Sequence, residues 1–160
     1  MTDKIVPCLW FDGDAEAATA FYVSLLSDSR VTAVNRSPVD TPSGQADSVL
    51  TVQFVLAGRN YLALNGGPAF RFTEAVSLIV MTEDQAETDR LWTALTADGG
   101  QESDCGWLKD RWGLSWQITP RRLMDLVTDP DPARAKAAMQ AMMTMQKIDI
   151  AALDAAVAKL

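Results

Sequence analysis

The sequence predicts an α+β fold in which two βαβββ modules follow one another and helices complete the chain. The same order of a short apolar strand, a helix and three more strands occurs over residues 1–68 and again over residues 74–120. The two copies align in type and order, with Leu9 matching Ile79 and Leu25 matching Leu95. Beyond Pro120 the apolar periodicity becomes helical. We therefore expect paired modules over 1–120 and a helical C-terminal extension over 121–160.

The first module begins with the apolar run Ile5–Phe11, which predicts a buried strand that contains Cys8. Asp12 or Asp14 is then expected to cap a helix. Alternating residues predict strands over 30–36, 47–57 and 61–65, and Ala57–Asn60 predicts a hairpin turn. The buried face of the helix is expected to hold the apolar residues at helical spacing, which are Ala15, Ala18, Phe21, Tyr22, Leu25 and Leu26.

The second module repeats this order with a strand over 75–81 and a helix that ends at Asp98-Gly-Gly100. Thr82 and Gln85 have the spacing of a capping box at the start of that helix. Leu91, Trp92 and Leu95 mark its buried face.

The segment Cys105–Pro120 is typical of a hairpin, with a tight turn at Asp110–Gly113. In the last strand Ser115, Gln117 and Thr119 alternate with Trp116 and Ile118, so one face is polar and the other apolar. The apolar face, with Trp116, should pack on a helix. The polar face must then meet water or line a cavity.

The extension is expected to form a short helix over 121–127 and a second one capped by Asp131, with Pro132 at its first position. Asp149 has the position of a cap for a last helix. That helix carries an apolar stripe, which we expect to be exposed unless another chain covers it, formed by Ile150, Leu153, Val157 and Leu160.

Composition excludes several classes of function. The net charge of −7 comes from interspersed acidic and basic residues, which argues against a nucleic-acid surface. The chain has no histidine, so a Ser-His-Asp triad, a histidine base and a histidine-based zinc site are impossible. No signal peptide or membrane-spanning run is present. Cys8 and Cys105 could form a single disulfide, but reduced thiols in a cytoplasmic protein are the favoured interpretation.

Several segments resemble the PhnB-like branch of the vicinal oxygen chelate superfamily, which includes glyoxalases, bleomycin-resistance proteins and ring-cleaving dioxygenases. The resemblance implies that the two βαβββ modules form a curled, partly open eight-stranded barrel, with the C-terminal helices added, and that the protein is a homodimer. The segments that carry it are Pro7–Glu16, Phe21-Tyr22, Leu62–Pro68, Cys105–Ile118 and Met142–Ile150.

In active members of that superfamily, four side chains from the first and fourth strands of the modules hold a divalent metal. The corresponding positions here are Ile5 or Pro7, Asn65, Ser77 and Gln117. None is a carboxylate or an imidazole, and neutral amides are weak ligands for such ions. We therefore expect no metal and no other cofactor. Some members of this branch are named after a methyltransferase of the ubiquinone pathway, but the sequence lacks the glycine-rich turn that would bind a nucleotide-type cofactor.

The favoured function is a glyoxalase- or bleomycin-resistance-like protein that binds a small planar or aromatic molecule in a metal-free barrel cavity. Asn65, Ser77, Trp107 and Gln117 are the predicted ligand-binding residues. The alternative is a lyase or dioxygenase-type enzyme with an atypical metal site, so whether the protein is an enzyme stays open and no catalytic residue is assigned. Alternatively, the side-chain amides of Asn65 and Gln117 form hydrogen bonds with each other, with the backbone or with water rather than with a ligand.

Five further residues are expected to have structural rather than ligand-binding roles. Cys105 is expected to be a small residue in a loop rather than a nucleophile, and Cys8 a core residue. Lys109, Asp110 and Arg111 are expected to form a solvated hairpin tip.

Overall fold

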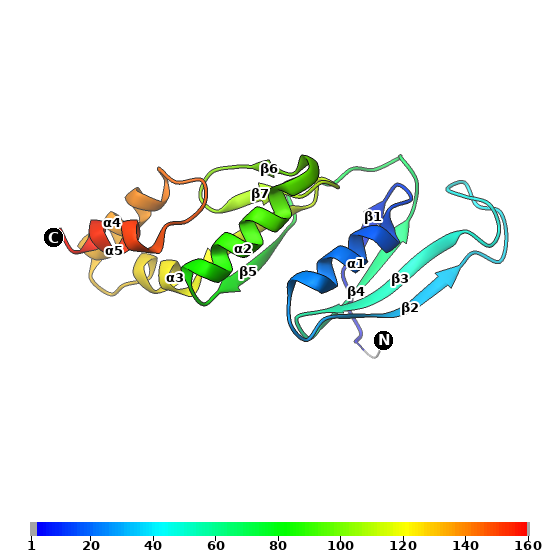
Figure 1. The fold of residues 1–160 in the computed structure, drawn as a ribbon, viewed down its shortest axis with the longest axis horizontal. Helices are drawn as coiled ribbons and strands as arrows, with labels where there is room; N and C mark the ends of the chain where they lie inside the picture. The colour runs from blue at the N-terminus through cyan, green and yellow to red at the C-terminus, as the bar shows by residue number, and fades with distance from the viewer. Residues whose placement is uncertain (1–2, 160) are drawn as a thin grey trace. The chain divides into compact units, whose positions relative to one another are not determined.

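The computed structural model describes residues 3–159, and the chain divides into two compact units, Met1–Phe72 and Thr73–Leu160 (Figure 1). Each unit contains one four-stranded sheet and helices, which confirms the α+β class and the two βαβββ modules. The helices after residue 120 belong to the same compact unit as the second module. The units are described separately below.

In the first module one helix covers one face of a mixed sheet (Figure 1). The strand order is β1-β4-β3-β2, with β1 parallel to β4 and the other pairs antiparallel. Leu9 and Phe11 face the helix with Val52 and Phe54, and all four are buried. The elements are β1 (Cys8–Phe11), α1 (Ala15–Leu25), β2 (Arg30–Arg36), β3 (Val49–Leu56) and β4 (Arg59–Asn65).

Two expectations for the start of this module are wrong. The strand begins at Cys8, and Ile5 is 87% exposed. Pro7 precedes the strand, where it has no N–H to donate and only its carbonyl accepts a bond, from the N–H of Leu62 at 3.0 Å. Cys8 is exposed rather than part of the core, because successive side chains of β1 alternate between the faces and Leu9 points to the helix.

The second module has the same topology, with strand order β5-β8-β7-β6 and β5 parallel to β8. The two modules therefore share one plan, as the sequence repeat predicted. Its elements are β5 (Ser77–Thr82), α2 (Gln85–Thr96), a short 3-10 turn (Ala97–Gly99), β6 (Gln101–Glu102), β7 (Trp107–Lys109) and β8 (Ser115–Pro120). Its core is built from the apolar faces of the helix and the hairpin, and its buried residues include Leu91, Trp92, Leu95, Leu108, Trp116 and Ile118.

The cap of α2 lies two residues later than expected. The carboxylate of Asp84, not the hydroxyl of Thr82, accepts from the N–H of Glu87 at 2.8 Å, and Glu87 accepts from the N–H of Glu83 at 2.9 Å. Thr82 is still the last residue of β5, and its hydroxyl bonds that of Thr88 at 2.7 Å. A capping box is present, but the strand extends through the residue that was expected to begin it.

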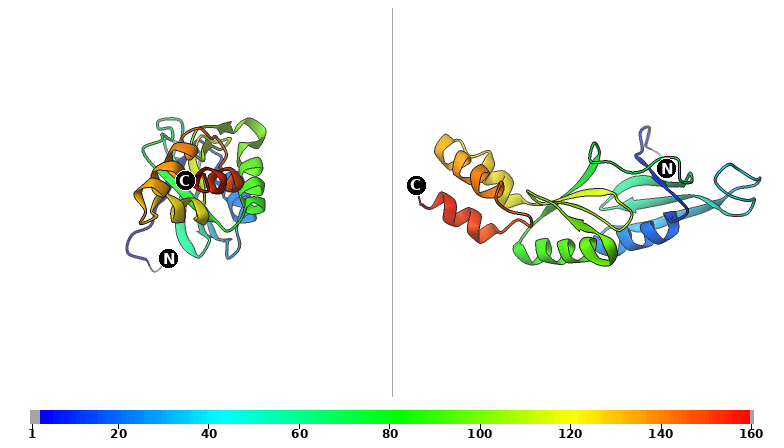
Figure 2. Two further views of the ribbon diagram at one scale, coloured as in Figure 1. Left: turned by 90° about the vertical axis from the view of Figure 1, so that its left-hand side faces the viewer. Right: turned by 90° about the horizontal axis from the view of Figure 1, so that it is seen from above.

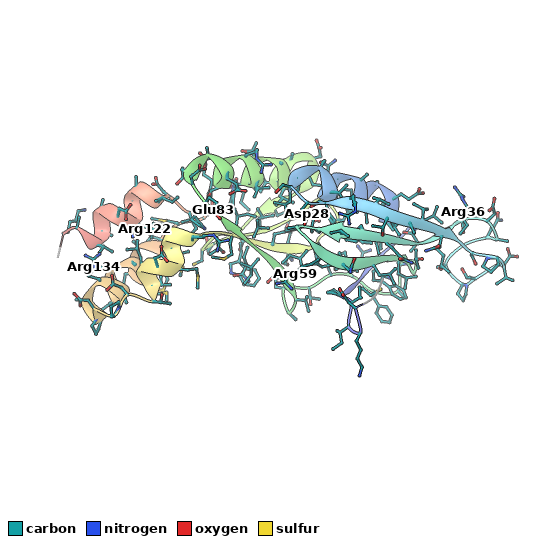
Figure 3. All side chains as sticks on the ribbon, turned by 90° about the horizontal axis from the view of Figure 1, so that it is seen from below. Asp28, Arg36, Arg59, Glu83, Arg122 and Arg134 are labelled. Carbon is teal, nitrogen blue, oxygen red and sulfur yellow. The ribbon has the colours of Figure 1, made fainter. Side chains whose placement is uncertain are left out.

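The extension consists of α3 (Arg121–Val127), α4 (Pro132–Met142) and α5 (Ile150–Val157), which pack on one another (Figure 2). Asp131 and Asp149 cap α4 and α5 as predicted. Arg122 on α3, labelled in Figure 3, also pairs with Asp154 on α5 at 2.7 Å. The extension has a core of its own, formed by Leu123, Leu126, Ala138, Ile148, Leu153 and Val157.

This core corrects the expected exposed stripe. Leu153 and Val157 are buried inside the extension, because α3 and α4 cover the face of α5 that carries them. Ile150 is half-buried, and Leu160 lies outside the described residues.

Candidate functional site

The polar face of the second sheet is built by the register of its hairpin. Trp107 lies opposite Gln117, and Lys109 lies opposite Ser115. Residues opposite one another in an antiparallel pair project from the same face, so these four side chains share the face turned away from α2. The alternation read from the sequence of β8 therefore places its polar residues as expected.

Ser77 joins this face from β5. The side-chain N–H of Gln117 donates to the hydroxyl of Ser77 at 2.9 Å, across the parallel β5–β8 pair. Ile79, on β5, lies beside Gln117 of β8, and it is 57% exposed. Three of the four residues predicted to bind a ligand, Ser77, Trp107 and Gln117, thus lie on one face of one module.

Asn65, the fourth, lies on the first module and bonds the backbone there. Its Oδ1 accepts from the N–H of Ala15 at 2.9 Å, and its Nδ2 donates to the carbonyl of Val49 at 2.9 Å. The nominal N-cap residue of α1, Asp14, makes no side-chain capping bond. Asn65 therefore supplies the cap of α1 from the end of β4, which was one of the two interpretations left open.

Of the two glycines after Asn65, Gly66 is required by its contact with Trp10, and Gly67 by its left-handed backbone, with φ 86°. A Cβ added at Gly66 would lie 2.2 Å from the indole ring of Trp10, and the indole N–H donates to the carbonyl of Gly67 at 2.8 Å. No residue with a side chain fits at Gly66 unless the ring moves. This part of the tryptophan and glycine pattern is therefore structural.

A pocket of about 450 Å³ opens on the second module. It is lined by residues of β6 and β7, by the loop 103–105, by Ser115 on β8 and by Glu74. Trp107 and Lys109 lie in its wall. Lys109 pairs with Glu74 at 2.5 Å, and the hydrogen bond from this ammonium lowers the pKa of the Glu74 carboxyl.

The hairpin tip is less solvated than expected, because Asp110 is buried. Its Oδ1 accepts from the N–H groups of Trp112 and Leu114, at 2.9 and 3.1 Å, and its Oδ2 accepts from the indole of Trp116 at 2.9 Å. The expectation of a solvated Asp110 is wrong because its carboxylate organises the turn and binds the core tryptophan. An aspartate three residues before a turn glycine, as in Asp110 and Gly113, is the sequence signal for such a role.

Ser115 also lines the pocket, although it was not among the predicted ligand-binding residues. It is 1% exposed, and its hydroxyl has no hydrogen-bond partner within residues 3–159. The alternation of β8 places it on the polar face, but nothing in the pattern predicts that its partners would be missing. Cys105 also lines the pocket, with a left-handed backbone at φ 61°.

The superfamily's metal does not fit the residues at the predicted positions. Pro7 and the exposed Ile5 offer no side-chain ligand. The Oδ1 of Asn65 already accepts a backbone N–H, and Ser77 and Gln117 bond each other. In residues 3–159 no three His, Cys, Asp or Glu side chains are grouped so that they could hold a metal ion.

Comparison with known proteins places these features in a family. The family model described as 3-demethylubiquinone-9 3-methyltransferase matches residues 3–119. A PhnB protein from Bacillus cereus is 32% identical, with a TM-score of 0.66, over 74% of this chain and 99% of that one. The chain belongs to this family. It is thus a PhnB-like member of the vicinal oxygen chelate superfamily.

A protein from Pseudomonas aeruginosa shares the fold of this PhnB-like chain, with 23% identity and a TM-score of 0.60 over 74% of this chain and 98% of that one. None of the curated proteins matches the chain. The family match ends at residue 119, before α3 begins. Within the described residues, no helix of this PhnB-like protein has both the length and the apolar character needed to cross a membrane.

Proposed function

We propose that this PhnB-like protein binds a small planar or aromatic molecule, without a metal ion, on the polar face of its second module. The observation that supports this most directly is the pocket whose wall contains the half-buried ring of Trp107. Stacking on a tryptophan ring is favourable for planar molecules and is strengthened when the ring is partly desolvated. Gln117 and Ser77 lie beside Trp107 on the same face and supply polar groups.

Asn65, on the first module, stays a proposed ligand-binding residue in its own right. Its two backbone bonds in the first module already give it a structural role. A ligand role for it would require that the remaining hydrogen-bonding capacity of the amide is used by the bound molecule.

Two enzymatic functions, that of a lyase or dioxygenase and that of a methyltransferase, have less support than ligand binding. A lyase or dioxygenase of this superfamily would need metal ligands, and the four expected positions supply only neutral amides and a hydroxyl besides Ile5 or Pro7. The methyltransferase activity in the family's description would need a site for a methyl donor. The turn after β1 contains Gly13 as its one glycine, which does not favour a nucleotide-type cofactor.

A homodimer in the cytoplasm is part of the proposal. Cys8 and Cys105 are both free thiols, which agrees with a reducing compartment. The apolar side chains that remain exposed on the extension, Met124, Met139 and Met143, are available for a second copy of the chain. Sedimentation that shows a monomer at micromolar concentration would contradict the dimer.

The proposed binding is tested with 2-naphthol, a neutral planar probe, followed by NMR at the backbone N–H groups of the pocket residues Ser103 and Asp104, which are present in every variant. We expect saturable shifts in the native protein and no saturable shifts in Trp107→Ala. Trp112→Phe is the matched control, because this tryptophan belongs to the same hairpin but does not line the pocket. Absence of saturable binding, or equal binding by Trp107→Ala, would contradict the proposal.

A further inference from the structure

The hydroxyl of Ser115 indicates where a ligand makes a hydrogen bond. Buried hydroxyl groups in folded proteins nearly always have a partner, because leaving one unpaired is unfavourable. Ser115 has none within the described residues, although it is almost completely buried. It projects from the polar face of β8 and lines the pocket. A bound molecule with a hydrogen-bonding group would supply the missing partner.

The charge of the pocket favours a cation. Two carboxylates on this side of the sheet line it, those of Glu74 and Asp104, against the single ammonium of Lys109. Lys109 is already paired with Glu74 at 2.5 Å. The carboxylate of Glu102 is not counted, because Glu102 lies opposite Leu108 and accepts from the indole of Trp92 on α2 at 2.7 Å, on the other face of the sheet. The remaining excess of negative charge raises the local concentration of cations and repels anions.

The ring of Trp107 also favours a positively charged ligand. The face of an indole ring carries partial negative charge and attracts ammonium groups, more strongly than other aromatic rings do. A planar cation can therefore stack on Trp107 while its charged end meets the carboxylates. An anion would gain only from Lys109, which would first have to leave Glu74.

The wall of the pocket is fixed by the extension. The N–H of Cys105 donates to the carbonyl of Met145, and that of Gly106 donates to the carbonyl of Gln146, both at 2.7 Å. Cys105 and Gly106 both have left-handed backbones, with φ of 61° and 83°. These bonds hold the loop in that conformation, so the pocket is formed before any ligand arrives, which lowers the entropy cost of binding.

The part of the extension that supports this wall is itself anchored to α2. Gln85 donates to the carbonyl of Ile148 at 3.0 Å and accepts from the N–H of Ile150 at 2.9 Å. Lys147 pairs with Asp89 at 2.7 Å, and the hydrogen bonds to this carboxyl, first from Lys147 and then from Gln85, lower its pKa. The extension begins after the end of the family match at residue 119. The support of this wall is therefore a feature of the chain outside the matched part.

We infer that the pocket on the second module binds a small aromatic molecule that carries a protonated nitrogen, with Ser115 as its hydrogen-bonding partner and the extension as the element that shapes the wall. This inference rests on the proposed binding function and names the chemical class of its ligand. Ser115 and Asp104 are thereby assigned roles in a site to which the sequence pattern assigned only Trp107.

The test compares three molecules with one ring system and different charge: 2-naphthylmethylammonium, neutral 2-naphthol and 2-naphthoate. Dissociation constants are measured by NMR titration at low ionic strength and again at high ionic strength. We expect the ammonium compound to bind roughly five- to tenfold more tightly than 2-naphthol, and the carboxylate to bind most weakly. The advantage of the ammonium compound should shrink at high salt.

Variants locate the effect. Asp104→Asn should reduce the affinity for the ammonium compound by about two- to fivefold and leave the affinity for 2-naphthol unchanged. Asp125→Asn removes the same charge from an exposed position on α3 outside the pocket and should change neither. Ser115→Ala should weaken the ammonium compound by roughly fivefold.

The outcomes separate this inference from the proposed function. If 2-naphthol binds in a manner that depends on Trp107 but the ammonium compound has no advantage, the inference is overturned and the binding function stands. Tightest binding of the carboxylate also overturns it. If none of the three molecules binds, both proposals fail. A charge preference that is equal in Asp104→Asn and the native protein would place the effect elsewhere and would overturn the assignment to this pocket.

Discussion

The side chain of Asn65, at the end of β4, accepts a hydrogen bond from the backbone N–H of Ala15, the first residue of α1, at 2.9 Å. A helix leaves its first N–H groups without partners inside the helix, and a side-chain oxygen nearby stabilises them. Here the residue that caps the helix comes from a strand fifty positions away in sequence. The helix of the first module is thereby tied to the last strand of its sheet.

Asn65→Ala should destabilise the first module by about 1–3 kcal/mol, because the N–H of Ala15 and the carbonyl of Val49 both lose a buried partner. Urea unfolding measures the effect. Asn35→Ala is the control, since the amide of Asn35 bonds Thr51 in an exposed position, and it should cost less than about 0.5 kcal/mol. Equal costs for the two variants would show that Asn65 does not cap the helix.

Asp110→Asn should be more costly, by about 2–3 kcal/mol. An asparagine can keep its oxygen on the N–H groups of Trp112 and Leu114, but its NH₂ group then faces the indole N–H of Trp116, which loses its acceptor. Denaturant unfolding, together with the indole proton resonance of Trp116, follows the change. Asp125→Asn removes an exposed carboxylate and serves as control. Stability that is unchanged within about 0.5 kcal/mol would contradict the structural role of Asp110.

These two residues show what the sequence can and cannot predict. Alternation in β8 and the two-fold repeat predicted the fold and the polar face, because periodicity follows directly from strand and helix geometry. The roles of Asn65 and Asp110 depend on which backbone groups lie beside them after folding. Asn65 meets Ala15 through long-range packing, and no local pattern contains that contact. Ser115 was missed for the same reason, because a missing partner has no signature in the sequence.

Ser115→Ala should leave the free energy of unfolding unchanged or raise it by up to about 1 kcal/mol. The substitution removes a buried hydroxyl that has no partner within residues 3–159, so no hydrogen bond is lost and an unfavourable burial is relieved. Ser77→Ala provides the contrast, because it removes the acceptor of the Gln117 bond and should cost about 0.5–1.5 kcal/mol. A clear loss of stability in Ser115→Ala would show that the hydroxyl has a partner in the free protein, such as a bound water molecule.

Gly106→Ala should destabilise the second unit by about 2–4 kcal/mol. Gly106 has φ 83°, and a Cβ there would lie 2.9 Å from the carbonyl oxygen of Ile118 and 3.1 Å from Cγ1 of Ile148. Backbone strain adds to the close contacts with β8 and with the extension. Gly113→Ala separates them, since Gly113 has φ 86° but nothing within 4 Å of an added Cβ, and should cost only about 1–2 kcal/mol. Thermal unfolding compares the stability of Gly106→Ala with that of Gly113→Ala. An equal loss of stability in both variants would mean that the loop around Gly106 does not pack against β8 and the extension.

Removal of divalent metal should not change the melting temperature. In a metal-bound member of the superfamily the ion binds the folded chain, so its removal lowers stability by mass action. Asn65, Ser77 and Gln117 supply only neutral oxygens, and hydrogen bonds within the protein already use the Oδ1 of Asn65 and the hydroxyl of Ser77. A divalent cation would lose more hydration there than these groups replace. We expect EDTA to shift the melting temperature by less than about 1 °C. A drop of several degrees that one added metal reverses would show a metal site that this donor chemistry does not predict.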